Sequence, residues 1–163
     1  MRNRFGGQES ANCDLTTRQN VDIHLALVTV KPSTLDLTNL DVQCTSVTAE
    51  IISHRRPIDW EILGRMTGTP AAKKLTAAKS KLADENLARP IRVRGQLMFD
   101  ASHGLCTAAG HITSGNPARR AGWEIHPVYA IDVCKATSMT TCSIDDDSRW
   151  TPLDQWLTSD EGD

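Results

Sequence analysis

Histidines and carboxylates recur in four short segments of the chain, beside apolar residues. The segments are Asp22-Ile23-His24, Ala49-Glu50-Ile51, Asp100 with His103, and Trp123-Glu124-Ile125-His126. In a β-strand, successive side chains point to opposite faces, so Asp22 and His24 share one face while Ile23 takes the other. The same alternation places Glu124 and His126 together, about 7 Å apart along a strand. The pattern predicts one polar patch built from several strands, with Trp123 and Ile125 in the core.

Three imidazoles with several carboxylates suffice for a divalent metal ion, because zinc binds histidine nitrogen and carboxylate oxygen. The candidate metal ligands are His24, His103 and His126. The wider set of ligand-binding candidates comprises Asp22, His24, Glu50, Asp100, His103, Glu124 and His126.

Two other interpretations of the same residues stay open. A histidine oriented by a carboxylate also serves as a general base, which makes Glu50, Glu124 and His126 the catalytic candidates. The polar residues also suit cross-strand pairs that stabilise a sheet without any chemistry. Four arginines lie near the ends of the strands that carry Glu50 and Glu124, where they either attract an anionic ligand to that face or keep the loops soluble; they are Arg55, Arg56, Arg119 and Arg120.

Composition restricts the partners. The 163 residues carry 18 basic and 20 acidic side chains, for a formal net charge of -2. This balance does not indicate a nucleic-acid partner held by a broad basic surface. No run of apolar residues approaches the roughly 18 that a membrane-spanning helix needs. The expected partner is a small ligand or a protein.

The five cysteines, at positions 13, 44, 106, 134 and 142, include no Cys-x-x-Cys pair, which argues against a zinc ribbon. The residues after Met1 lack the apolar stretch of a secretory signal. As written, the chain is expected in the cytoplasm with free thiols. If a leader is missing, it is extracytoplasmic. A disulfide between Cys134 and Cys142 is the alternative to free thiols at those positions.

The order of predicted elements favours a mainly β fold with an α insert. Strands are expected at 21–30, 42–52, 91–100 and 123–133, and two helices at 58–66 and 70–87. An OB-like five-stranded barrel carries its helix between strands 3 and 4. The match requires a first strand before Val21, where residues 1–20 provide at most a degenerate one.

One domain is predicted, in three parts. Residues 1–20 form an irregular segment, residues 21–134 the OB-like barrel, and residues 135–163 a C-terminal extension. Thr151-Pro152 opens a short helix there, and its Leu153 and Trp156 are expected to dock on the body.

Three segments also resemble a bacterial family of uncharacterised proteins. They are the Asp-x-His-Leu strand at Asp22, the segment from Gly95 through Phe99-Asp100 to His103, and Trp123-Glu124-Ile125-His126-Pro127-Val128. The resemblance covers roughly residues 10 to 134 and implies a small OB-type barrel. It implies no activity. The function predicted from the sequence is therefore a small binding module whose patch holds a small ligand or metal ion. The alternatives are a metal-dependent hydrolase or nuclease using the same patch, and a purely structural polar network.

Overall fold

The computed structural model describes residues 2–5, 20–29, 44–55, 89–101, 105–106 and 119–158. The chain divides into two compact units. The first consists of Met1–Arg56 with Gly95–Val128, and the second of Pro57–Arg94 with Tyr129–Asp163. No helix among the described residues is long and apolar enough to cross a membrane.

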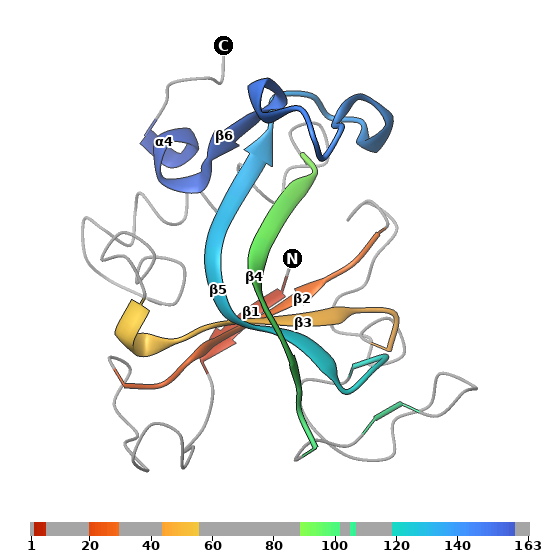
Figure 1. Cartoon of the computed structure of the whole chain (residues 1–163), viewed down its shortest axis with the longest axis vertical. Coiled ribbons are helices and arrows are strands. Elements are labelled where there is room, and N and C mark those ends of the chain that lie inside the picture. Colours follow the sequence, from red (N-terminus) through yellow and green to blue (C-terminus); the bar gives the residue numbers. More distant parts are fainter. Residues whose placement is uncertain are drawn as a thin grey trace. The chain divides into compact units, whose positions relative to one another are not determined.

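The architecture is mainly β. The strands are β1 (Arg2–Phe5), β2 (Ile23–Leu27), β3 (Val47–Ile51), β4 (Ile91–Phe99), β5 (Trp123–Cys134) and β6 (Trp150–Pro152). Five of them hydrogen-bond in the order β1-β2-β3-β5-β4, and β6 pairs with β5 (Figure 1). Short 3₁₀ turns occupy Ser53–Arg55, Met139–Thr141 and Asp147–Arg149.

The predicted closed barrel is wrong. The path of paired strands ends at β1 on one side and at β4 on the other, so the sheet is open and mixed. A barrel needs each strand paired along both edges, and alternation within a strand says nothing about whether the two end strands meet. The helices predicted at 58–66 and 70–87 fall outside the part of the chain that the structure describes. Within that part, the α-helix is α4 (Leu153–Thr158).

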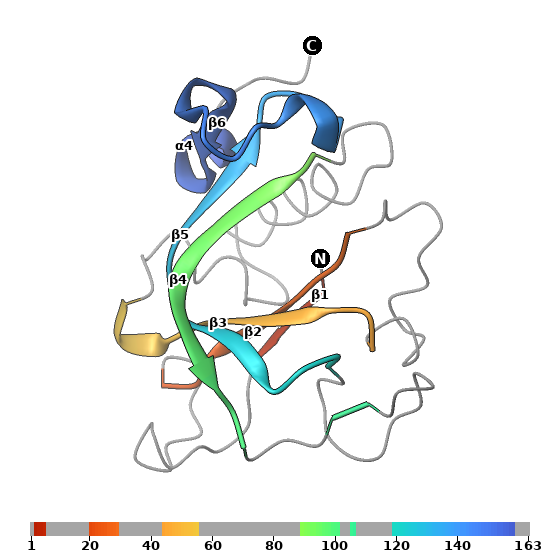
Figure 2. The same ribbon diagram turned by 45° about the vertical axis from the view of Figure 1, so that its right-hand side comes forward.

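The first unit is built on three adjacent strands, which both ribbon views show side by side (Figure 2). β2 pairs antiparallel with β1 and with β3. β1 lies in the segment predicted to be irregular. Its sequence lacks apolar alternation, and its place in the sheet comes from backbone pairing with β2. One face of β2 and β3 buries Ile23, Leu25, Ala49 and Ile51, as their alternation predicted.

A long-range disulfide also belongs to the first unit. Cys44 and Cys106 are joined across a sequence separation of 62 residues. The backbone N–H of Cys106 donates to the carbonyl of Arg119, and the N–H of Arg120 donates to the carbonyl of Ser46. The disulfide and these two hydrogen bonds together fasten the segment before β5 to the segment before β3.

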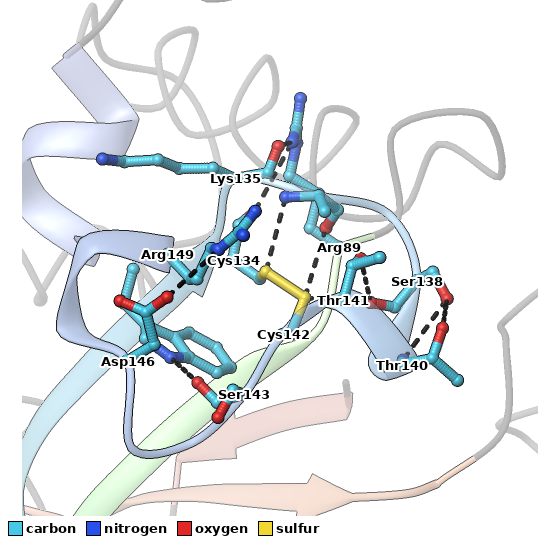
Figure 3. The surroundings of a disulfide bond; sticks show 12 residues. Arg89, Cys134, Lys135, Ser138, Thr140, Thr141, Cys142, Ser143, Asp146 and Arg149 are labelled. Carbon is cyan, nitrogen blue, oxygen red and sulfur yellow. Dashed lines mark hydrogen bonds and ion pairs between the residues drawn. A yellow bond between two sulfur atoms is a disulfide. The ribbon is translucent and has the colours of Figure 1, made fainter.

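The second unit is stapled by a local disulfide. Cys134 at the end of β5 bonds to Cys142, and both pack with Trp150 of β6. Arg89 donates to the carbonyl oxygens of Cys134 and Lys135 beside this bond (Figure 3). The expectation of free thiols is wrong at these positions and at Cys44 and Cys106, because folding brings both pairs into bonding distance. Cys13 is not among the described residues.

Ion pairs and aromatic contacts complete the second unit. Arg92 binds Asp132 of β5 and Asp147, and its guanidinium stacks 5.0 Å from the Trp150 ring centroid. α4 begins directly after Pro152, and its Leu153 and Trp156 are buried. The residues between Cys134 and Trp150 thus attach to β4 and β5 by a covalent bond, charge pairs and packing.

Candidate metal centre

The strand register brings the predicted polar residues onto one face. His24 of β2 lies directly opposite Glu50 of β3. β3 runs parallel to β5 with Ala49 aligned to Ile125. Because side chains alternate, Glu50 shares its face with the residues on either side of Ile125, which are Glu124 and His126. Asp22 precedes β2 by one residue and lies two positions before His24.

This polar face is buried. Asp22 and Glu124 are each 1% exposed, and His24 and Glu50 are each 5% exposed. The sequence predicted that these residues point away from the core formed by Ile23 and Leu25, but it did not predict that water is excluded there too. Buried charges are costly unless they meet partners, so their contacts determine what the face does.

Three side chains converge closely enough to hold a metal ion. Asp22, Glu50 and His126 each offer one ligand atom, and these atoms lie within 4.8 Å of one another. Nε2 of His126 is 3.7 Å from Oδ2 of Asp22, and Nδ1 of His126 is 3.7 Å from Oε2 of Glu50. The backbone N–H of Ser53 donates to Oδ1 of Asp22 at 3.1 Å and so helps to fix that carboxylate.

The other predicted site residues lie around this group. His24 is not in the three-residue group, but its Nε2 lies 3.4 Å from Oε1 of Glu50. Asp100 turns to Arg119 instead, and Glu124 lies between Arg119 and His126. His103 belongs to the part of the chain that the structure leaves undescribed.

Arg119 is a site residue whose burial and partners the sequence did not predict. Its side chain is 0% exposed, and its Nη1 lies 2.7 Å from Oδ2 of Asp100 and 2.6 Å from Oε2 of Glu124. The sequence placed this arginine near the end of the strand that carries Glu124, either attracting an anionic ligand or keeping a loop soluble, and its burial shows that the second interpretation is wrong. The available signal was the number of carboxylates on one predicted face, because carboxylates that become buried together require a cation nearby.

The neighbouring carboxylates also change the pKa of His126. The pKa of His126 is raised above its ordinary value, first by the interaction with Glu124 and then by the charges of Glu50, Glu124 and Asp22, while burial opposes the shift. Nδ1 of His126 lies 3.4 Å from Oε1 of Glu124, yet within the described residues it makes no hydrogen bond of good geometry. The contact is an ion pair when the imidazole is protonated. The centre favours a cation at this imidazole, whether a proton or a metal ion.

An aromatic residue beside the centre in the sequence differs from expectation. Trp123, predicted in the core, is 51% exposed, and Phe99 is 55% exposed. Their ring centroids are 5.2 Å apart in an edge-to-face arrangement. Alternation does place Trp123 and Glu124 on opposite faces of β5, but the polar face is the buried one here.

No family model matches the chain, and neither a curated protein nor a solved structure matches it. The resemblance to uncharacterised bacterial proteins stays a prediction.

Proposed function

We propose that this chain is a binding module in which Asp22, Glu50 and His126 take up a divalent metal ion. The observation that supports the proposal is the convergence of two carboxylates and one imidazole from three separate segments, with ligand atoms within 4.8 Å of one another. One nitrogen and two oxygen donors suit Zn²⁺ or Mn²⁺ better than Ca²⁺, which prefers a shell made only of oxygens.

The three candidate ligands differ in solvent exposure, and His126 is the most exposed of them. The side chains of Asp22 and Glu50 are 1% and 6% exposed, whereas that of His126 is 17% exposed. An ion bound here would be coordinated by the two buried carboxylates, and solvent or a small ligand would reach it from the side of the imidazole. Three protein ligands leave at least one position of a tetrahedral ion for water or a small ligand.

The two disulfides indicate the compartment in which the protein acts. Because paired cysteines persist in oxidising compartments, Cys44–Cys106 and Cys134–Cys142 support an extracytoplasmic protein. Alkylation of free thiols followed by mass spectrometry on protein taken from its native cells tests this inference. Reaction at the four paired positions without reductant would contradict it.

Metal binding is tested on the purified full chain. The protein is stripped with chelator, reconstituted with Zn²⁺ or Mn²⁺, desalted and analysed for metal content, and affinity is measured by titration calorimetry. We expect stoichiometric binding by the wild type. Asp22→Asn, Glu50→Gln and His126→Ala should each weaken binding about tenfold or more, which corresponds to about 1.4 kcal/mol.

The control is Asp132→Asn. Asp132 is a buried carboxylate on β5 that pairs with Arg92 and Arg94 in the second unit, outside the centre. This variant should bind metal as the wild type does. A wild-type protein that takes up no metal under these conditions would leave the polar face as a structural network.

A further inference from the structure

We propose that Glu124 is a positioning residue of the metal centre: it accepts the Nδ1 proton of His126 and leaves Nε2 to bind the ion beside Asp22. The inference rests on the proposed function, since it assigns which nitrogen of His126 is the ligand. It concerns a residue that is not itself in the group of Asp22, Glu50 and His126.

Each nitrogen of His126 faces one candidate ligand at 3.7 Å, Glu50 at Nδ1 and Asp22 at Nε2, and the shorter contact with Glu124 distinguishes Nδ1 from Nε2. Nδ1 is buried and lies 3.4 Å from Oε1 of Glu124, closer than its 3.7 Å separation from Glu50. Nε2 lies 3.7 Å from Oδ2 of Asp22, a member of the candidate ligand group. A neutral imidazole carries its proton on one nitrogen and offers a lone pair on the other. The nearer carboxylate at Nδ1 favours the tautomer whose lone pair is on Nε2.

A hydrogen bond from Arg119 fixes the orientation of the Glu124 carboxylate. Its second oxygen, Oε2, accepts from Nη1 of Arg119 at 2.6 Å, and the same nitrogen donates to Asp100 at 2.7 Å. Arg119 is in turn fixed through its carbonyl, which accepts from the backbone N–H of Cys106. Since Oε2 is occupied by the guanidinium, Oε1 is the oxygen that faces His126.

A histidine that binds a metal commonly donates its other ring N–H to a carboxylate, which fixes the ring and raises the basicity of the ligand nitrogen. Loss of such a partner typically weakens metal binding by about 10- to 100-fold. Glu124 supplies this carboxylate here. Arg119 keeps one of its oxygens engaged and so prevents the carboxylate from turning into the metal position.

Glu124→Gln tests the assignment because Arg119 fixes the orientation of the new amide, which in turn decides which nitrogen of His126 carries the proton. Arg119 donates only, so the amide oxygen of the glutamine must face it. The amide NH₂ then faces Nδ1 of His126, which must accept, and the proton moves to Nε2. The matched control is Asp132→Asn, which also turns a buried, arginine-bound carboxylate on β5 into an amide but lies outside the centre.

Two measurements are made on wild type and both variants. The first is the ¹⁵N chemical shifts of the His126 ring in metal-free protein, above the pKa of the imidazole, which report the tautomer. The second is Zn²⁺ affinity by competition with a chelator. We expect an Nδ1–H tautomer in the wild type and in Asp132→Asn, and an Nε2–H tautomer in Glu124→Gln with affinity reduced about 10- to 100-fold.

The outcomes separate this inference from the proposed function. Wild type that binds metal while Glu124→Gln keeps its affinity and tautomer overturns the positioning role and leaves the metal site standing. Wild type that binds no metal but shows the tautomer switch overturns the metal site and with it the role of Glu124 in metal binding; only the control of the His126 tautomer by Glu124 then stands. Equal losses of affinity in Glu124→Gln and Asp132→Asn overturn the inference as a general stability effect. If Glu124→Gln does not fold, an Nε2–H tautomer in the wild type overturns it as well.

Discussion

Replacing Arg119 with methionine should destabilise the protein more than any exposed charge change. Arg119 is 0% exposed, and its two partners, Asp100 and Glu124, have side chains 9% and 2% exposed. Methionine fills much of the same volume but removes the charge. Two buried carboxylates then face each other without their guanidinium.

The magnitude follows from the burial. Removing one partner of a buried ion pair costs about 3–5 kcal/mol, because the remaining charge stays desolvated. For a chain of this size each kcal/mol lowers the melting temperature by about 2–4 °C, so Arg119→Met should melt about 6–20 °C below the wild type. The loss should already appear in metal-free protein, since the ion pairs of Arg119 with Asp100 and Glu124 require no metal ion.

The matched control is Arg149→Met. Arg149 pairs with Asp146 at 3.2 Å, but their side chains are 56% and 44% exposed, so water screens the pair and it should contribute far less to stability than the buried pairs of Arg119. Urea unfolding followed by far-UV circular dichroism measures both variants under the same conditions. A loss at Arg119 no larger than the loss at Arg149 would refute the claim that a buried guanidinium holds Asp100 and Glu124.

Three further outcomes are expected. Closing a loop of 62 residues in the unfolded chain stabilises the folded state by about 4 kcal/mol, and closing one of 8 residues by about 2.5 kcal/mol. Replacing both cysteines of Cys44–Cys106 by alanine should therefore lower the free energy of unfolding more than the same change at Cys134–Cys142. Urea unfolding that gives the reverse order would contradict this. An NMR titration of metal-free protein should find the pKa of His126 above its ordinary value of about 6.5, chiefly because of Glu124. The stability that this shift adds to the fold is fully present below the unfolded-state pKa and is lost as the pH rises through the folded-state pKa. A pKa at or below the ordinary value would count against the ion pair. Gly95→Ala should cost about 1–3 kcal/mol, since its Cβ would clash with Ile125 Cγ2 and lie 2.5 Å from the carbonyl oxygen of Pro127. Gly122→Ala should cost less, since its Cβ would meet chiefly the exposed Phe99 ring at 2.9 Å, with the carbonyl oxygen of Asp100 at 3.2 Å. Equal melting temperatures for the two variants would show that β4 moves to accept the methyl group.

Local alternation predicted a large part of the candidate site. It placed Asp22 with His24 and Glu124 with His126, and it separated them from Ile23 and Leu25. This works because the period of two is a property of the strand itself and needs no knowledge of its neighbours. The mainly β class follows from the same pattern.

Pairing between strands decided the rest. The antiparallel register of β2 on β3 sets His24 against Glu50, and the parallel register of β3 on β5 brings Glu50 to His126. A shift of one residue in either register would turn these side chains to the other face. No local pattern specifies that register.

Burial too was decided by the tertiary structure. The sequence shows the charge of Arg119 and the apolar surface of Trp123, but the fold buries the arginine between two carboxylates and leaves the tryptophan half exposed. The same holds for Cys44 and Cys106, which bond across 62 residues. The amino-acid sequence by itself determined which side chains share a strand face. Only the tertiary structure decided which of them meet and which face excludes water, because both depend on contacts between residues far apart in the chain.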